Sequence, residues 1–338
     1  MSGVVLRDAL ISEAVYEVKD LPQFGQQLLN EKQLWELGLP SNVAFTLISM
    51  LENPKQTGLQ AAIYRDFLSP QGSGYVLSFS GTQMDPSDLI ADVLQGLGLD
   101  ESDWLEYAGV LKQYPTAMKI GYEFGRAIRN LGMSPRTTGH SLGGGLASAA
   151  SIAANKSEMP ANTFNAAGLH VNTVTYRDSK GKLLHGVPFT DGAIAQYRIE
   201  QGNTGRIKAF FVEYDALTYL QSNLPTLPFI GDIPRAAGMP IKLIGTANSI
   251  MKVTERSILN NMKEFPKPES GAKLLAWVVR YNKWLSEFVV TNSAFFSRAI
   301  NLHKMRSVLY GLLVQRELSG GVYKSRKFDI FGYSTVEE

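Results

Sequence analysis

Apolar and polar residues alternate along the first 130 residues with two different periods. Residues 1 to about 55 follow a helical period. Two strand patterns come next, Leu59 to Tyr64 and Tyr75 to Ser80, and the turn-prone residues between them predict a hairpin or two neighbouring strands. From Asp85 to Asn130 the pattern is helical again, with its longest run around Tyr114 to Ile128.

The rest of the chain continues to alternate between strand and helix patterns. A helix of small residues begins near residue 142, and the strand before it should be short, because Pro135 and Arg136 replace aliphatic residues there. A second hairpin is predicted from Val171 to Tyr176 and Lys182 to Val187, and Ala209 to Val212 is a strong apolar strand. This alternation predicts an α/β fold with a mostly parallel central sheet and helices on both faces.

We expect one domain over residues 1–338, divided into segments of different character. These are an N-terminal helical segment (1–55), a core that carries the sheet (56–225), a helical insertion or cap (226–300) and a C-terminal segment (301–338). No internal repeat or low-complexity tract interrupts this organisation.

Charge and composition exclude several classes of function. The 33 basic and 31 acidic residues leave a net charge of +2, so no overall field attracts nucleic acid. The absence of cysteine removes disulfide, thiolate and zinc–thiolate chemistry. Asp8, Glu13 and Glu17 interrupt any apolar stretch near the start, so no cleavable signal peptide is predicted. Residues 137–155 carry no charge but are too polar to span a bilayer, and no transmembrane helix is predicted.

Residues 139–143 read Gly-His-Ser-Leu-Gly, the Gly-x-Ser-x-Gly pattern of a serine nucleophile. The pattern predicts that Ser141 lies on a sharp strand-to-helix turn, where only small residues fit at Gly139 and Gly143. The following helix would direct its first N–H groups at the reacting centre, so the N–H of Leu142 would stabilise an oxyanion. The alternative is a close-packed glycine turn with no catalytic role, and the small-residue helix that follows favours the nucleophile.

Longer motifs on either side of this serine resemble the class 3 (fungal-type) lipases, and two of them are more similar to the leaderless bacterial phospholipases A1 within that class. Three motifs resemble the nucleophile turn, the strand before the oxyanion residue and the start of the lid: Thr138 to Ala147, Tyr75 to Thr82, and Leu89 to Asp92. The two that are closer to the phospholipases A1 are Thr163 to Gly168 and Glu213 to Thr218. The resemblance covers roughly residues 10 to 250, thins, and recovers around His303.

This resemblance implies an α/β-hydrolase fold that acts on lipid esters without a metal or an organic cofactor. It also implies that the N–H of Thr82, helped by its hydroxyl, is the second oxyanion donor beside Leu142, and that Asp92 anchors that loop. From spacing alone, Thr82 would be an ordinary turn residue and Asp92 a helix cap. The related phospholipases imply leaderless export by specialised secretion machinery and peripheral contact with membranes. An inhibitory, immunity-type partner protein would protect the producing cell.

The catalytic base follows from the four histidines of the chain. His140 precedes Ser141 within the motif, so its side chain should point away from the nucleophile. In this fold the histidine comes last in the chain order, after the acid, and His170 and His185 come too early. His303 lies after the last candidate acid and at the start of a helix, so it is the predicted base, as the late histidine of the family also implies. The alternative for His303 is a solvated or capping histidine.

The predicted acid is Asp215, at the end of the apolar strand that contains Ala209 to Val212. This position places its carboxylate at the carboxyl edge of the sheet, where it would orient His303 and stabilise the imidazolium without taking its proton. Asp191 is the first alternative, although Asp-Gly at that point is typical of a plain turn. Asp232 is the second, because it also follows the nucleophile.

Two amphipathic segments bear on the substrate. Residues 271–300 carry an apolar stripe with tryptophans beside it, which either rests in a lipid headgroup layer or packs on the core. Residues 84–99 form either a lid that opens at a lipid surface or a fixed helix.

The residue pattern predicts an ester hydrolase that acts through an acyl-enzyme, and the resemblance to the phospholipases A1 implies that it cleaves the sn-1 acyl ester of phospholipids. Such an enzyme could serve as an antibacterial or membrane-damaging effector. The nearest alternative is a neutral-glycerolipid lipase or a carboxylesterase on the same scaffold. An alternative of another class is a non-catalytic membrane-interaction or toxin protein.

Overall fold

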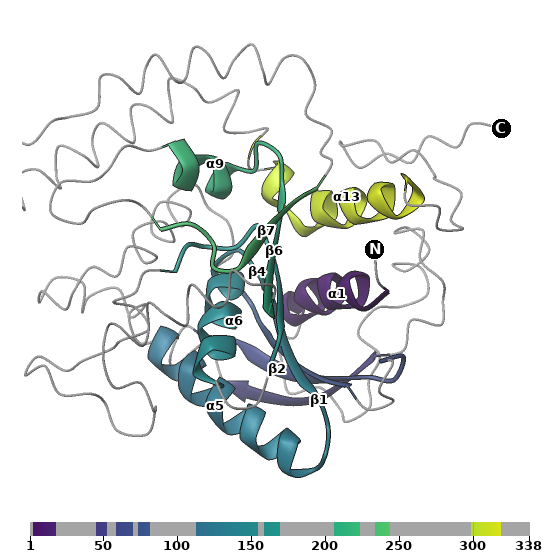
Figure 1. The fold of residues 1–338 in the computed structure, drawn as a ribbon, viewed down its shortest axis with the longest axis vertical. Coiled ribbons are helices and arrows are strands. Elements are labelled where there is room, and N and C mark those ends of the chain that lie inside the picture. Colours follow the sequence, from purple (N-terminus) through teal and green to yellow (C-terminus); the bar gives the residue numbers. More distant parts are fainter. Residues whose placement is uncertain are drawn as a thin grey trace, which may run out of the picture.

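The strands form one mixed sheet, which is antiparallel at one edge and parallel elsewhere (Figure 1). The computed structural model describes residues 3–17, 45–52, 59–69, 74–81, 113–154, 159–169, 206–223, 234–243, 299 and 301–318. Seven strands of these residues pair in chain order: β1 (Phe45–Glu52), β2 (Ala61–Asp66), β3 (Gly74–Phe79), β4 (Pro135–His140), β5 (Ala161–Phe164), β6 (Ile207–Val212) and β7 (Met239–Leu243). β1, β2 and β3 are antiparallel neighbours, and β3 to β7 run parallel. The carboxyl ends of β4, β5 and β6 therefore share one edge, where open α/β sheets place their functional loops.

Helices cover both faces of this sheet. α5 (Gln113–Asn130) and α6 (Leu142–Ala153) lie on one face, and α1 (Gly3–Glu17) and α13 (Met305–Leu318) lie on the other (Figure 1). α9 (Ala216–Asn223) directly follows β6. A parallel sheet with helices on both faces and a serine turn between a strand and a helix is the α/β-hydrolase fold, so the predicted fold class is confirmed.

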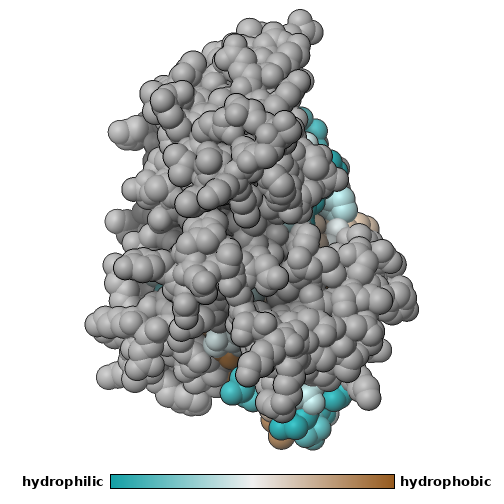
Figure 2. Space-filling model, turned by 90° about the vertical axis from the view of Figure 1, so that its left-hand side faces the viewer, coloured by the Kyte–Doolittle hydropathy of each residue, from teal (hydrophilic) through white to brown (hydrophobic). Residues whose placement is uncertain are grey.

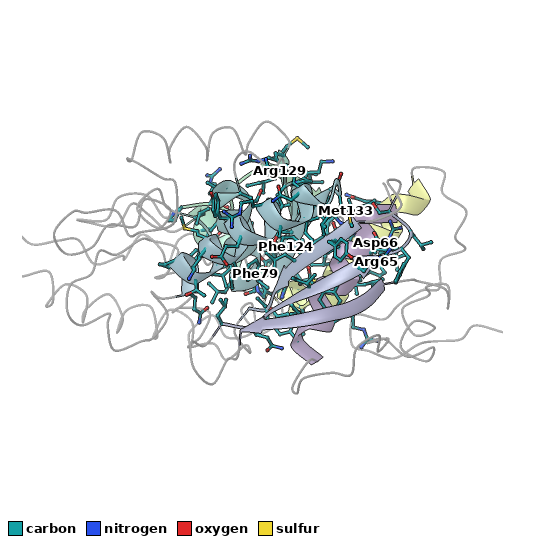
Figure 3. The ribbon with its side chains drawn as sticks, turned by 90° about the horizontal axis from the view of Figure 1, so that it is seen from below. Arg65, Asp66, Phe79, Phe124, Arg129 and Met133 are labelled. Atoms are coloured by element: carbon teal, nitrogen blue, oxygen red, sulfur yellow. The ribbon has the colours of Figure 1, made fainter. Side chains whose placement is uncertain are left out.

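The core on the α5 and α6 face is built from large side chains around a helix of small ones. Every residue of α6 is buried, which its glycine, alanine and serine content permits without leaving charges inside. Phe79 of β3 and Phe124 of α5 belong to the same buried cluster and lie between the sheet and the helix in Figure 3. The start of α6, and with it the serine turn, is thereby packed against a rigid layer.

On the opposite face, α1 is held to the sheet by a buried group of charges. Arg136 of β4 donates to Asp8 of α1 and to Asp66 of β2, at 2.7 Å in each case. Arg7 pairs with the same Asp66 at 2.8 Å, and the Asn162 amide donates to Asp8 at 2.6 Å. Buried charges are tolerated when they are paired and hydrogen bonded, as each of these is.

This cluster explains why the strand before the serine is longer than predicted. The sequence indicated a short strand, but β4 runs from Pro135 to His140 and all six of its residues are buried. Pro135 stands at the first position, where proline is compatible with a strand, and the charge of Arg136 is balanced by the two aspartates. The prediction was wrong because it weighed the side chains without their partners.

Two other predictions need correction. The expected helical segment 1–55 is helical in α1, but β1 is a strand that pairs with β2, and its phenylalanine, threonine and isoleucine are residues that favour strands. The expected helical insertion 226–300 contains β7, which extends the sheet beyond β6. β7 has only five residues and includes Pro240 and Lys242, so its strand signal is weak.

Several predicted elements are confirmed. The hairpin-like pair is β2 and β3, the long helical run is α5, and the strong apolar strand is β6. The predicted hairpin within 171–187, the segment 84–99 and most of 271–300 lie outside the described residues. The proposed division of one domain into segments stays a prediction.

The described residues leave few large apolar side chains exposed. On the face that Figure 2 shows, most of the described residues that reach the surface are hydrophilic. The large apolar side chains exposed in the described part are Phe67, Leu68, Leu131 and Met239. Isolated exposed apolar residues are common on water-facing proteins. Among the helices of the described residues, none combines the length and apolarity needed to cross a membrane.

Candidate active site

Ser141 lies on a strained turn between β4 and α6. Its backbone has φ 58° and ψ −130°, a conformation that non-glycine residues rarely adopt. Added Cβ atoms at Gly139 and Gly143 would lie 2.2 Å from the carbonyl oxygens of Gly143 and Phe79, so only glycine fits on either side. The predicted sharp turn, with its requirement for small neighbours, is confirmed.

Strain is concentrated along the edge of the sheet where this turn lies. Among the described residues, the non-glycine residues with positive φ are Ser141, Asn165 and Tyr214. They follow the carboxyl ends of β4, β5 and β6, respectively. Backbone strain of this kind costs about 1–3 kcal/mol per residue and gathers at functional sites. The strain marks the same edge that carries the candidate catalytic residues.

The surroundings of Ser141 offer backbone N–H groups for an oxyanion. Leu142 is the first residue of α6, and the first N–H groups of a helix have no acceptor within the helix. Gly81 follows β3 and lies against the serine, because a Cβ added to Gly81 would be 3.1 Å from Ser141 Cβ. Thr82 comes next in the chain but lies outside the described residues, as does Asp92.

The structure brings Asp215 and His303 together, although they are 88 residues apart. His303 Nδ1 hydrogen bonds to one carboxylate oxygen of Asp215, and both side chains are completely buried. The other oxygen accepts the backbone N–H of Thr218 at 2.7 Å, at the start of α9. The carboxylate is therefore fixed through both oxygens and can orient the imidazole.

Two polar atoms of this site are buried without a partner. Ser141 Oγ and His303 Nε2 make no hydrogen bond within the described part of the chain. Unpaired buried polar atoms are rare and call for an explanation, such as a catalytic role. The His303 ring lies beside that of His140, the residue before Ser141, with 4.7 Å between the ring centroids. A hydroxyl and an imidazole nitrogen thus remain available for proton transfer in one buried region.

Two residues of this region were not selected from the sequence. Asn165 Nδ2 donates to the carbonyl oxygens of Leu302 and His303, at 3.2 and 2.9 Å, and its Oδ1 accepts the N–H of Val212 at 2.9 Å. His140 had been set aside because of its place in the motif, yet its Nε2 lies 2.6 Å from the His303 carbonyl oxygen. The available signal for Asn165 was an asparagine directly after a strand, since asparagine tolerates positive φ.

Burial controls the charge of His140. Burial, and to a smaller extent the nearby His303, lower the pKa of this imidazole to about 3, so His140 is neutral at physiological pH. The neutral ring can donate one hydrogen bond and accept one.

The other candidate residues lie elsewhere. His170, His185, Asp191 and Asp232 are outside the described residues. Within the described part, no group of three or more histidine, aspartate or glutamate side chains is arranged to hold a metal ion.

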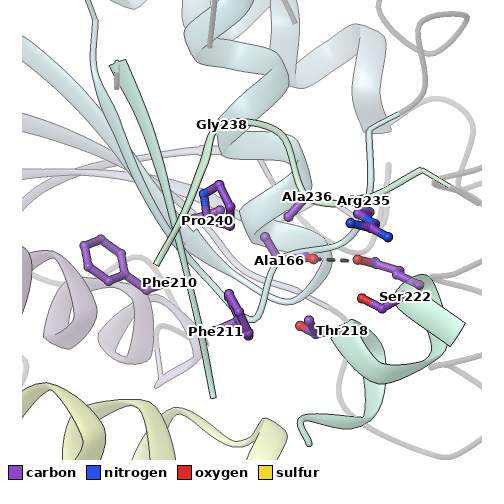
Figure 4. A pocket seen from close by; sticks show the side chains of 11 residues that line it. Ala166, Phe210, Phe211, Thr218, Ser222, Arg235, Ala236, Gly238 and Pro240 are labelled. Atoms are coloured by element: carbon purple, nitrogen blue, oxygen red, sulfur yellow. Dashed lines mark hydrogen bonds between the residues drawn. The ribbon is translucent and has the colours of Figure 1, made fainter. Parts of the chain in front are cut away.

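A cavity of about 440 Å³ lies between β6, β7 and α9 (Figure 4). Its described lining is mainly apolar, with Arg235 at one side and the amide of Gln221, which lies 3.5 Å from the carbonyl oxygen of Ala166. Of the described residues, neither Ser141 nor His303 lines it. Thr218 does line it, and its backbone N–H holds the Asp215 carboxylate, so the cavity adjoins the site on the side of the candidate acid.

Comparison with known proteins gives consistent results. Residues 7–264 match a family model described as "Phospholipase-like: Tle-like phospholipase domain". The chain is 28% identical over 221 residues to the extracellular phospholipase A1 of Serratia liquefaciens. That alignment covers 65% of this chain and 55% of the relative, so the chain spans about half the length of the curated relative it matches.

Solved structures of fungal lipases are also similar. One is a mutant form of MDLA from Penicillium cyclopium, with 17% identity, a TM-score of 0.40 and coverage of 72% of this chain and 78% of that one. Another fungal lipase structure has 17% identity, the same coverage and a TM-score of 0.38.

Proposed function

The chain belongs to the family of Tle-like phospholipase domains, and from this premise we propose that it hydrolyses the sn-1 acyl ester of glycerophospholipids, with Ser141 as the nucleophile. The observation that carries the proposal is the buried hydrogen bond between His303 and Asp215, together with the strained backbone of Ser141, whose hydroxyl has no partner among the described residues. Serine hydrolases on unrelated folds use the same three groups, which are recognised by geometry and not by sequence position.

In the proposed reaction, His303 Nε2 takes the proton from Ser141 Oγ as that oxygen attacks the ester carbonyl. Asp215 holds the imidazole in the tautomer that has its proton on Nδ1, and it stabilises the imidazolium that forms. The N–H groups of Leu142 and Thr82 bind the oxyanion of the tetrahedral intermediate, and Asp92 anchors the loop of Thr82.

Collapse of this intermediate breaks the bond to the glycerol oxygen, which takes the proton from the imidazolium. The products of this step are a lysophospholipid and an acyl-enzyme. Water then gives a proton to His303 and attacks the acyl-enzyme, which releases the fatty acid and restores the serine. Every group in this cycle comes from the protein, so the proposal requires no cofactor.

A phospholipid substrate is supported by the family and by the name of the Serratia relative. The competing proposal is a neutral-glycerolipid lipase or carboxylesterase with the same nucleophile. Fatty acids released from a phospholipid with different acyl chains at its two positions, and from triacylglycerol, should be compared. We expect release of the sn-1 chain. Equal release from both positions would contradict A1 specificity, and a preference for triacylglycerol would favour the lipase.

The serine mechanism is tested with a fluorophosphonate probe, which reacts with activated serines. Wild-type protein should be labelled, and Ser141→Ala should lose both labelling and lipid hydrolysis. Ser141→Ala that still damages membranes as wild type does would favour the non-catalytic membrane-interaction or toxin alternative. Full-rate labelling in His303→Ala would contradict the proposed base.

We also propose that the protein acts outside the cell that makes it, as the name of the Serratia relative supports. In this role it would attack the membranes of other cells, and an inhibitory partner would protect the producer. Fractionation of the producing cells should find the protein in the medium, with an intact N-terminus by mass spectrometry if export is leaderless. Affinity purification of Ser141→Ala from those cells should recover the inhibitor.

A further inference from the structure

The backbone carbonyl of His303 accepts two hydrogen bonds from beneath the active site. Asn165 Nδ2 donates one at 2.9 Å, and His140 Nε2 lies at 2.6 Å. A carbonyl oxygen can only accept, so the proton of the neutral His140 ring must be on Nε2. His140 Nδ1 is then an acceptor.

The acceptor side of His140 faces Tyr16 of α1. Tyr16 Oη lies 3.2 Å from His140 Nδ1 and 3.3 Å from the His140 carbonyl oxygen. The hydroxyl oxygen of Tyr16 also accepts the backbone N–H of Gly81 at 2.8 Å. One phenol therefore connects the strand end before Thr82 to the residue before Ser141.

These contacts form one chain of hydrogen bonds across the site. The chain runs from the Gly81 N–H through Tyr16 and His140 to the carbonyl of His303, whose side chain binds Asp215. It thus connects the segments that contain Gly81, His140 and His303, which are distant in sequence. Each segment supplies or precedes a group that the proposed reaction requires in a fixed place.

Simple filling of space does not account for this arrangement. An apolar side chain at position 140 would fill the same space without the free-energy cost of removing a polar imidazole from water. That loss of hydration also keeps the imidazole neutral. Its polar edge is instead matched at both nitrogens, and fully satisfied buried networks make a local structure rigid and unique.

We propose that His140 and Tyr16 are positioning residues, which hold the catalytic histidine and the strand end before the oxyanion loop in register with Ser141. This inference rests on the proposed function. His140 acts through the backbone carbonyl of His303. Tyr16 fixes the ring of His140 and the backbone of Gly81.

Two matched substitutions separate the two nitrogens of His140. In His140→Gln the side-chain amide reaches the place of Nε2 and can still donate to the His303 carbonyl. In His140→Asn the amide reaches only the place of Nδ1, near Tyr16, and the bond to His303 is lost. Misplacement of a catalytic group by about 1 Å can cost about 100-fold in rate, so we expect kcat to fall about 100-fold in His140→Asn and about tenfold or less in His140→Gln. KM should stay within about twofold in both, because the substitutions act on the position of His303 and so on the chemical step.

Equal losses of kcat in the two variants, or a loss confined to KM, would overturn the proposal. Thermal unfolding of both variants shows whether they fold. If either does not, Tyr16→Phe provides the second test, since it removes only the hydroxyl. It should lower kcat at unchanged KM, and wild-type kcat in Tyr16→Phe would overturn the role of Tyr16.

A spectroscopic measurement keeps this inference separate from the proposed function. The proton between His303 Nδ1 and Asp215 should give a far-downfield NMR signal in the wild-type protein. We expect the signal to shift or broaden in His140→Asn but to persist in His140→Gln, and an unchanged signal in His140→Asn would overturn the positioning role. This readout needs no turnover. Failure of the proposed function would instead appear as wild-type protein that the fluorophosphonate does not label.

Discussion

The buried, neutral His140 should make the protein sensitive to acid. In the unfolded chain its pKa has the ordinary value of 6.5, whereas burial lowers the pKa to about 3 in the folded protein. Between these values the unfolded chain binds nearly one more proton than the folded protein, so stability rises with pH and is lost as the pH falls. For a single group with this shift, the loss between pH 8 and pH 5 is about 2 kcal/mol. His140→Gln removes the titrating group and should remove that part of the pH dependence.

The assay is urea denaturation at pH 8 and pH 5, followed by tryptophan fluorescence, for wild type and His140→Gln. The wild-type free energy of unfolding should fall between the two pH values by about 2 kcal/mol more than that of the variant. Tyr16→Phe is the matched control, because it leaves the His140 ring buried and should keep the wild-type slope. The reasoning is refuted if wild type and His140→Gln lose the same free energy over this range.

Three further predictions concern the rest of the site and its support. Asp215→Asn should lower kcat by about 10⁴-fold, because an amide neither holds the correct tautomer nor stabilises the imidazolium; loss of less than tenfold on a chromogenic ester would contradict the pairing. Asp8→Ala should lower the free energy of unfolding by about 3–5 kcal/mol, since it leaves Arg136 short of one carboxylate. Addition of Arg136→Met should recover part of this loss in urea denaturation, and no recovery would speak against a buried ion pair. Gly143→Ala would place a Cβ 2.2 Å from the Phe79 carbonyl oxygen, so fluorophosphonate labelling should be abolished; labelling at the wild-type rate would disprove this close approach.

The sequence predicted those parts of the fold that depend on neighbouring residues. The pair β2 and β3 follows from alternating apolar positions around a turn, and α5 follows from a helical period. The predictions for β4 and β7 failed because residues far away in the sequence decide whether these segments form strands. β4 is a full strand because two aspartates from other elements neutralise Arg136, and β7 exists because β6 offers it a parallel neighbour.

The candidate site divides in the same way. The turn at Ser141 is specified locally, because the five residues of its motif contain the glycines that the crowded backbone demands. Among Asp191, Asp215 and Asp232, chain order alone left three candidate acids. The hydrogen bond to His303 distinguishes Asp215 from the other two, and its catalytic role stays a proposal.

The sequence by itself determined the class of fold, the family and the strained serine turn. Each of these can be recognised from short runs of contiguous residues, because the steric and hydrogen-bonding requirements involved are local. Only the tertiary structure decided which carboxylate hydrogen bonds to His303. It also decided that the ring of His140 packs against the ring of His303. Hydrogen bonds require atoms to lie about 3 Å apart, and only the order of the strands and the packing of α1 and α13 bring such distant residues within that distance.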